Sequence, residues 1–258
     1  AVVPAALMIE WMAHAALHGH PGMVFNGLNK FSVLKGITLT EDEAITISAN
    51  VQSAQDGIVP VQIVSQQGGK TRVHAKAAVH LGNKVLPAAK AQITETFAKD
   101  GRKRADVYST NFLFHGTELE GIKLVNESSA KGIAATIVAA PKPSAWIAEP
   151  LRQTWITEPL MLDCCFQLMI LWTQKFQGAH SLPTGVGHYR QFVRRFPKDA
   201  MTLRIRITKI EQQIVRANLE CLDSKGKLLA TIDDYECVLD PSLKAAFAKN
   251  QLPQLQQS

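Results

Sequence analysis

The sequence predicts an α+β fold of the double-hotdog type, in which two long apolar helices are each wrapped by a curved antiparallel sheet. The first observation is a run of strong helix formers at 4–18 that starts with a proline and contains almost no polar residue. The second is a similar run at 159–177, which also starts with a proline. The third is that strand candidates follow each helix. A helix that is apolar on every side must be buried, and a sheet curved around it provides the cover.

The strand candidates are short and rich in valine, isoleucine and threonine, and turns with glycine, aspartate or glutamine–glycine separate them. A hairpin turn is expected at 223–227, DSKGK, between the last two strands. The candidates are 31–40, 44–54, 59–66 and 71–81 after the first helix, and 201–210, 214–222 and 228–239 after the second.

These elements divide the chain into regions. Residues 1–98 are expected to form the first hotdog, 99–112 a linker, 113–241 the second hotdog and 242–258 a tail rich in proline and glutamine. The chain starts at full hydrophobicity with AVVPAALMIEW. We therefore expect the first hotdog to lack its N-terminal strands and the loop that precedes its helix.

The composition is that of a folded protein with a mild positive charge. At 258 residues, with 46% hydrophobic and 19% charged residues, the chain can bury a substantial core, which excludes a disordered protein. The net charge of +6 is too small to predict a nucleic-acid partner. The dense basic cluster KDGRKR at 99–104 is expected in a solvated loop, and a patch for nucleic acid or an acidic partner is the open alternative.

Neither a membrane span nor a metal site is predicted. No stretch reaches the roughly 18–20 uninterrupted apolar residues of a spanning helix. Cys164 and Cys165 fall in the second helix, Cys221 and Cys237 fall in strand candidates, and none has the spacing of metal ligands. Reduced core thiols and a cytoplasmic location are therefore expected.

The second helix carries a polar pair in its apolar sequence, EPLMLDCCFQLMILW. Asp163 and Gln167 are four residues apart, so they share one face of the helix. Burial of the carboxyl group would raise the pKa of Asp163 and let it act as a general acid near neutral pH. The alternative is a solvent-facing Asp163 that the helix dipole stabilises, with Gln167 on the same wet side. The pattern alone leaves both interpretations open.

Three motifs resemble those of polyketide synthase dehydratase domains, in the same order along the chain. LDCCFQ at 162–167 is similar to the family's DxxxQ motif, and VVPAALMIEWMA at 2–13 is similar to the end of its HxxxGxxxxP motif, with Pro4 as the last residue. LFHGTELEGI at 113–122 resembles the motif between the two hotdogs, GYxYGPxF or LFHGPxFQGI. This chain has Thr117 and Leu119 where that motif has proline and phenylalanine, which changes the wall it forms.

The resemblance implies a hydro-lyase that removes water from a β-hydroxyacyl thioester carried on the phosphopantetheine arm of an acyl carrier protein. Asp163 would be the catalytic acid and Gln167 would orient it or bind the hydroxyl group. The substrate site would be lined by Pro4, Leu113, His115 and Gly116. No cofactor or metal is implied. The implied partners are the acyl carrier protein and neighbouring synthase domains, and the oligomeric state stays open between monomer and homodimer.

The same resemblance assigns the catalytic base to a histidine about six residues before Ala1, because the motif ends at Pro4. The chain alone is then expected to turn over negligibly. Among its own histidines, His115 is the best candidate for a base by position, and its counterpart in the family lines the site. A structural role is expected for His14, His18 and His20 at the first helix, and no motif supports a role for His74, His80, His180 or His188.

Two alternatives to a dehydratase remain. A product-template domain would guide the cyclisation of a poly-β-ketone and would need a deep pocket the size of aromatic rings. A non-catalytic double hotdog would serve as a docking or structural module with a decayed acid–base pair.

Overall fold

The computed structural model describes residues 2–39, 44–67, 69–109, 112–241 and 243, so the predicted tail at 242–258 lies outside the described residues except for Leu243. The described residues contain more strand than helix, and two of the helices are long. The helices are α1 (Ala5–His18), α2 (Arg104–Tyr108) and α3 (Pro159–Gln177), with short 3-10 helices η1 (Thr117–Leu119) and η2 (Pro143–Ala145). The strands are β1 (Val24–Val33), β2 (Ile47–Val51), β3 (Ile58–Gln67), β4 (Lys70–Gly82), β5 (Ile122–Ser129), β6 (Gly132–Ile137), β7 (Ser181–Gln191), β8 (Met201–Glu211), β9 (Ile214–Leu222) and β10 (Leu228–Leu239).

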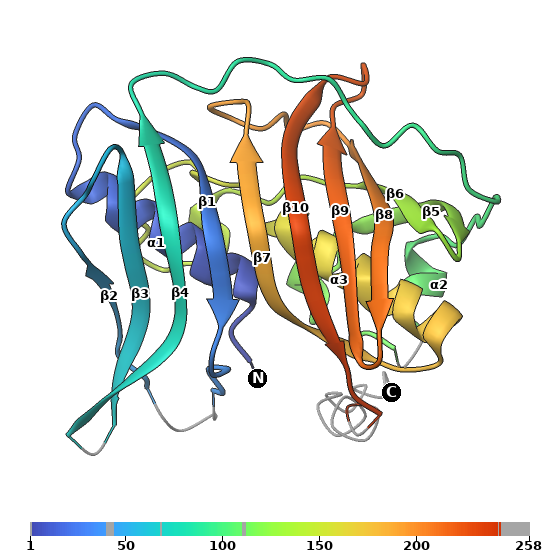
Figure 1. Cartoon of the computed structure of the whole chain (residues 1–258), viewed down its shortest axis with the longest axis horizontal. Helices are drawn as coiled ribbons and strands as arrows, with labels where there is room; N and C mark the ends of the chain where they lie inside the picture. The colour runs from blue at the N-terminus through green and yellow to red at the C-terminus, as the bar shows by residue number, and fades with distance from the viewer. Residues whose placement is uncertain (1, 40–43, 68, 110–111, 242, 244–258) are drawn as a thin grey trace, which may run out of the picture.

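The strands form one 10-stranded sheet in the order β2-β3-β4-β1-β7-β10-β9-β8-β6-β5 (Figure 1). Strands β1 to β4 come from the region predicted as the first hotdog, 1–98, and β5 to β10 from the region predicted as the second, 113–241; these are the two halves of the fold. The halves meet where β1 pairs antiparallel with β7, for example Leu28 opposite Tyr189. The two hotdog sheets are therefore joined edge to edge in the middle of the molecule.

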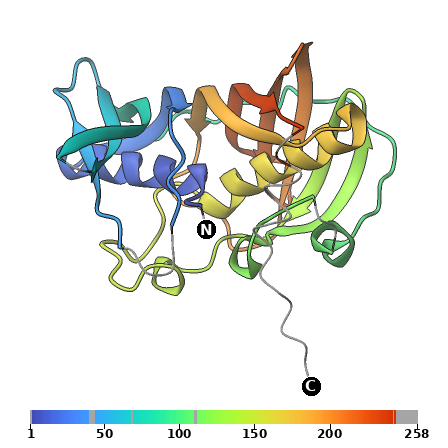
Figure 2. The ribbon, with the colours of Figure 1, turned by 90° about the horizontal axis from the view of Figure 1, so that it is seen from below.

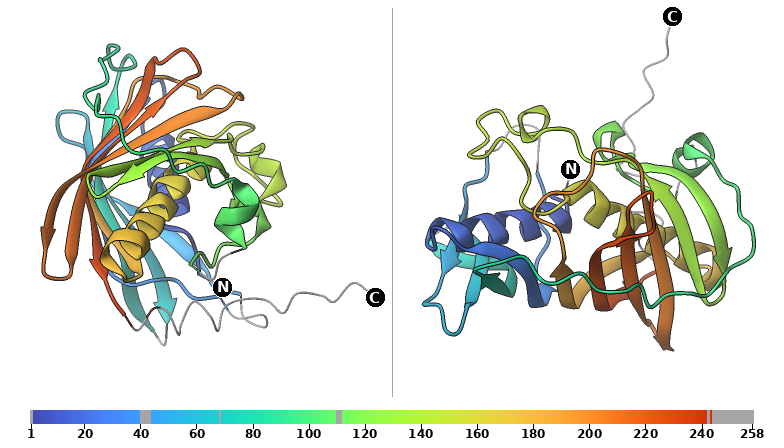
Figure 3. Two further views of the ribbon diagram at one scale, coloured as in Figure 1. Left: turned by 90° about the vertical axis from the view of Figure 1, so that its right-hand side faces the viewer. Right: turned by 90° about the horizontal axis from the view of Figure 1, so that it is seen from above.

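Each long helix is covered by its own half of the sheet. Helix α1 contacts β1 to β4, and α3 contacts β5, β6 and β7. The helices lie in a row on the same side of the sheet and contact each other, with their N-terminal ends near the middle (Figure 2). Seen from the side of the second half, the sheet curves around α3 (Figure 3). The double-hotdog prediction is confirmed.

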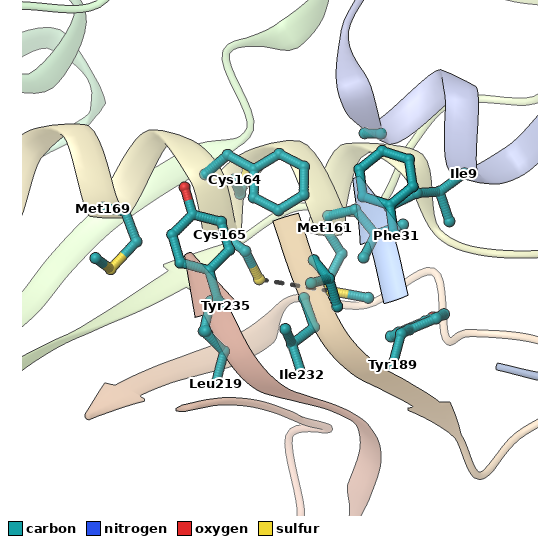
Figure 4. Close-up of a cluster of buried hydrophobic side chains, with 14 of the residues drawn as sticks. Ile9, Phe31, Met161, Cys164, Cys165, Met169, Tyr189, Leu219, Ile232 and Tyr235 are labelled. Atoms are coloured by element: carbon teal, nitrogen blue, oxygen red, sulfur yellow. Dashed lines mark hydrogen bonds between the residues drawn. The ribbon is translucent and has the colours of Figure 1, made fainter. Parts of the chain in front are cut away.

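The core is centred on α3, which is buried on every side from Pro159 to Thr173. Figure 4 shows its apolar residues against the strands, with Cys165 beside Met161, Sγ to Sδ 3.9 Å, and Tyr235 close to the same helix. Phe166 stacks on Tyr235 with ring centroids 5.5 Å apart. Because this surrounding is apolar, the polar side chains on α3 that share it need internal partners.

The segment between β4 and α2 crosses from the first half to the second along the ends of the strands (Figure 1). Buried Glu220 of β9 anchors it by accepting hydrogen bonds from the backbone N–H groups of Gln92, 2.5 Å, and Ile93, 3.1 Å. Further along, the Asp100 side chain is 2% exposed and pairs with Arg102 at 2.7 Å and Lys175 at 3.0 Å. Part of the basic cluster at 99–104 is thus held in an ion-pair network.

The four cysteines are buried and none forms a disulfide. Within the described ranges, no group of histidine, cysteine, aspartate and glutamate side chains is arranged to hold a metal ion. No helix in that part of the chain is long and apolar enough to cross a membrane.

Candidate active site

Asp163 lies in the second turn of α3, which begins at Pro159. Proline suits the first turn because its missing N–H has no helical partner there. The Asp163 residue is 3% exposed, so the solvent-facing alternative is wrong. Burial raises the pKa of Asp163, and the neighbouring His115 and the hydrogen bond from Gln167 offset only part of this effect. The carboxyl group is therefore biased toward its protonated form.

Gln167 holds Asp163 from the next turn of the same helix. Its Nε2 donates to Asp163 Oδ2 at 2.6 Å and to the backbone carbonyl of Leu119 at 2.8 Å. Its Oε1 accepts a hydrogen bond from the Tyr108 hydroxyl at 2.7 Å. Both amide N–H groups and the oxygen are engaged, so the orientation of this fully buried carboxamide is fixed.

Tyr108 completes this chain of hydrogen bonds from α2, inside the region predicted to be a linker. Its hydroxyl donates to Gln167 and accepts from the backbone N–H of Ile122, the first residue of β5, at 3.0 Å. Burial raises the pKa of Tyr108, so the hydroxyl remains a donor. Asp106 stabilises the start of α2 by accepting from the Lys103 N–H at 2.8 Å.

His115 faces the carboxyl group from the segment before η1. Its Nε2 lies 3.5 Å from Asp163 Oδ2, and its side chain is 8% exposed. The ring stacks on Phe114 with centroids 4.6 Å apart. Burial lowers the pKa of His115, and Asp163 offsets part of that shift. Both shifts favour the uncharged pair, a neutral imidazole beside a protonated carboxyl group.

The buried Nδ1 of His115 has no hydrogen-bond partner among the described residues. A buried polar atom without a partner costs stability, and it is free to bond a ligand. The other ring nitrogen of His115, Nε2, faces Asp163, so Nδ1 is the nitrogen that remains for a ligand.

The other residues predicted for the substrate site have different surroundings. Gly116 is the residue before η1, and an added side chain there would meet nothing within 4 Å. Leu113 is 6% exposed and belongs to the apolar core. Pro4 precedes α1, and its carbonyl accepts from Leu7 N at 3.1 Å. Neither Pro4 nor Leu113 forms a hydrogen bond or ion pair with Asp163, and their role in substrate binding stays a prediction.

Other histidines lie away from this network. His14 and His20 occupy the C-terminal part of α1 and the turn after it; His14 accepts from Arg152 Nε at 3.0 Å, and His20 contacts the Ala16 carbonyl at 2.8 Å. His74 is held between Ser65 Oγ at 2.8 Å and the Lys35 carbonyl at 3.0 Å. These contacts are structural.

The sequence analysis missed Tyr108 and the Leu119 carbonyl. Tyr108 is the single tyrosine in a polar stretch, and no spacing rule connects it to Gln167, which lies 59 residues away. The Leu119 carbonyl is a backbone group, so the residue type at that position carries no signal. Although Thr117 and Leu119 differ from the motif, they lie in the short 3-10 helix η1, and the carbonyl of Leu119 accepts from Gln167.

The chain matches the family model described as the polyketide synthase dehydratase N-terminal domain over residues 86–240. The protein therefore belongs to the polyketide synthase dehydratase family, whose members are generally hydro-lyases. None of the curated proteins matches the chain.

Solved structures of dehydratase domains share the fold. A trans-acyltransferase polyketide synthase dehydratase domain from Brevibacillus brevis superposes with a TM-score of 0.74 at 14% identity, covering 93% of this chain and 86% of that one. The dehydratase domain of RzxB from Pseudomonas fluorescens has a TM-score of 0.72 at 15% identity, covering 92% and 86%. A trans-acyltransferase polyketide synthase enoyl-isomerase has a TM-score of 0.68 at 16% identity, covering 92% and 90%. At these identities the likeness establishes the fold.

Proposed function

We propose that this site removes water from a β-hydroxyacyl thioester carried on the phosphopantetheine arm of an acyl carrier protein, giving an α,β-enoyl thioester. The observation that carries the proposal is the buried Asp163 carboxyl group, which burial biases toward its protonated form and Gln167 holds in one orientation. A group that retains its proton near neutral pH is suited to protonate a leaving hydroxyl. Membership of the dehydratase family supports the same reaction.

In this mechanism Asp163 gives its proton to the departing β-hydroxyl, which leaves as water. The resulting carboxylate keeps the hydrogen bond from Gln167 Nε2, which stabilises the negative charge as it forms. Tyr108 prevents Gln167 from turning its oxygen toward the carboxylate, because the Tyr108 hydroxyl already donates to that oxygen. Gln167 and Tyr108 are thus positioning residues.

The second proton transfer takes the α-proton, and the electrons of that C–H bond form the double bond as the C–O bond breaks. One carboxyl group cannot both supply a proton and collect another at the start, so a separate base is required. A histidine is suited to this role, because its ordinary pKa lies close to neutral pH. We assign His115 to substrate binding, with its free Nδ1 as the hydrogen-bonding atom for the hydroxyl or the thioester carbonyl.

Acid–base chemistry alone accomplishes this reaction, so the proposal requires no metal or redox cofactor. The partners it requires are the acyl carrier protein and the neighbouring synthase domains. The intact hydrogen-bond chain from Tyr108 to Asp163 argues against a docking module with a decayed site.

The test is dehydration of a β-hydroxyacyl pantetheine thioester by the intact protein, followed by the absorbance of the enoyl product. Asp163→Asn should lower the rate by about 10²- to 10⁴-fold, the typical contribution of a general acid. Asp233→Asn, at an exposed position on β10, is the matched control and should leave the rate unchanged. Full activity of Asp163→Asn would remove the acid assignment.

His115 is tested in the same assay. If it binds substrate, His115→Asn should raise KM more than it lowers kcat. A loss in kcat as large as that of Asp163→Asn, with the acid limb of the pH profile abolished, would make His115 the base instead.

A further inference from the structure

A basic cleft lies at the end of α1, apart from the Asp163 network. Its volume is about 480 Å³, and four segments line it: the end of α1 with the turn after it, the start of β1, the loop before α3, and the end of β7 with the loop after it. We infer that this cleft, formed by Arg152, Arg194 and Arg195 with His18 and His20, binds a phosphate group.

The charge of the cleft is of one sign. Three guanidinium groups line it, and none of the described residues that line it is acidic. No carboxylate in the described part of the chain lies within ion-pairing distance of Arg152, Arg194 or Arg195, whereas Arg102, Arg206 and other arginines have such partners. The positive charge of Arg152 slightly offsets the rise that burial causes in the pKa of Glu10, but the Glu10 carboxyl group accepts its hydrogen bonds from Ile156 and Thr157.

The positive charge of these residues is larger than the partial negative charge at the end of α1 can balance. The last turn of α1 contains His18, and the carbonyl end of a helix carries about half a negative charge, which favours nearby cations. Three full positive charges exceed that half charge several-fold. The remaining positive charge creates an electrostatic field that attracts an anion into the concave site.

The walls of the cleft are fixed by hydrogen bonds, so the site exists before a ligand arrives. Gln191 at the end of β7 is 1% exposed and donates to the carbonyls of Ile156 at 3.0 Å and Val193 at 2.9 Å. Trp155 in the loop before α3 donates to the Pro141 carbonyl at 2.7 Å. The two Gln191 bonds tie the segment of Arg152 to the segment of Arg194 and Arg195.

The chemistry of the lining residues selects the ligand. A planar guanidinium group offers paired N–H donors that match two phosphate oxygens, and several arginines around one cleft suit a dianion better than a carboxylate. Arg152 uses its Nε for His14, which leaves its terminal nitrogens free. The volume is large enough for a phosphate group and part of the organic group that it is attached to.

The phosphate could be free in solution or part of a phosphorylated carrier arm, and calorimetric titration of the intact protein distinguishes these sources. The probes are inorganic pyrophosphate, 4′-phosphopantetheine and pantetheine without phosphate. Saturable binding of the phosphate probes, but not of pantetheine, is expected. Tighter binding of 4′-phosphopantetheine than of pyrophosphate would identify the arm, and the reverse would identify a free phosphate. The choice of the arm as a probe rests on the proposed dehydratase function, but the anion site does not.

The variant R194Q/R195Q should weaken binding of the phosphate probes by roughly 10-fold or more for each arginine removed. Raising the salt concentration should weaken it further in the wild type. Arg72→Gln, at an exposed position on β4, is the control and should bind like the wild type. Absence of saturable binding, equal binding of pantetheine, or unchanged binding by R194Q/R195Q would overturn the inference. The titration does not measure dehydratase activity, so a negative result for the phosphate site and a negative result for the proposed dehydratase function can be distinguished.

Discussion

Replacing Tyr108 with phenylalanine removes one hydroxyl group from the centre of the site and nothing else. That hydroxyl donates to Gln167 Oε1 at 2.7 Å and accepts from Ile122 N–H at 3.0 Å. In the variant, Gln167 Oε1 and the backbone N–H of Ile122 would each be buried without this hydrogen bond. Gln167 would keep its bond to the Leu119 carbonyl but would lose the contact that fixes its oxygen.

The size of the effect follows from these lost contacts. A buried polar group left unpaired costs about 1–3 kcal/mol. Two such groups, with some relaxation, should lower the free energy of unfolding by about 2–4 kcal/mol. Misplacement of the acid by about 1 Å can cost up to about 10²-fold in rate, so kcat should fall by roughly 10- to 100-fold. KM should change little, because Tyr108 contacts Gln167 and not the substrate.

The assay combines urea unfolding with dehydration kinetics on the intact protein. Tyr189→Phe is the matched control: it removes a buried hydroxyl that donates to Gln191 Oε1 at 3.0 Å, outside the Asp163 network. It should lower stability by about 1–2 kcal/mol without changing kcat. Equal kcat values for Tyr108→Phe and Tyr189→Phe would refute the positioning role of Tyr108.

Three further predictions concern stability. Burial raises the pKa of Asp163 in the folded state. The folded protein therefore loses stability as pH rises from the unfolded-state pKa of this group to its folded-state pKa. In calorimetry, the melting temperature of Asp163→Asn should be close to that of the wild type at acidic pH and higher than it at alkaline pH. Burial, with a smaller contribution from Glu10, raises the pKa of Glu158 from 4.5 to about 7. This shift corresponds to about 3 kcal/mol of destabilisation that is absent below about pH 4 and complete above about pH 7. Glu158→Gln should gain up to that amount at pH 8, and a loss there would contradict the sign. Gly121→Ala would place a methyl group 2.6 Å from Cys164 Sγ, so a loss of about 1–3 kcal/mol in urea unfolding is expected, and wild-type stability would exclude the clash.

The two long helices and most of the strands could be predicted because their signals are local. Helix α3 runs from Pro159 to Gln177, the range that the apolar run and its proline predict. Strands β8, β9 and β10 agree with the candidates at 201–210, 214–222 and 228–239 to within one residue. Continuous burial requires apolar residues at every position, and that requirement is visible in the sequence.

Strand β7 could not be predicted, although it joins the two halves. Its sequence SLPTGVGHYRQ contains a proline and two glycines, which disfavour a strand. Pro183 lies opposite Cys237 at a register shift where β7 has one residue more than β10, and a missing N–H is tolerated there. Gly187 is required because a side chain there would come within 2.6 Å of Asp234 Cβ. These reasons lie in the neighbouring strand, which local patterns do not report.

Strand β1 was misplaced for a similar reason. The candidate at 31–40 covers only the end of the observed strand at Val24–Val33. Register shifts interrupt its pairing with β4, and Lys30 has a positive φ of 52°. Such bulges break the alternation of buried and exposed residues that the prediction uses.

The candidate site was predictable only where residues share a helix. Asp163 and Gln167 are neighbours through helical spacing, and this spacing predicts their contact. His115 and Tyr108 approach them through the tertiary fold, and a motif or a structure is needed to find such contacts.

The central claim is that burial raises the pKa of Asp163 and so biases its carboxyl group toward the protonated form, and a titration of this group measures the shift directly. Selective ¹³C labelling of aspartate carboxyl groups, with Asp163→Asn to assign the signal, follows the carboxyl chemical shift against pH. The claim predicts a midpoint above 3.8, the ordinary value for aspartate, because burial is the largest influence on the group. A midpoint at or below that value would show a carboxylate that is ionised throughout the physiological range, and would contradict the role of Asp163 as a proton donor.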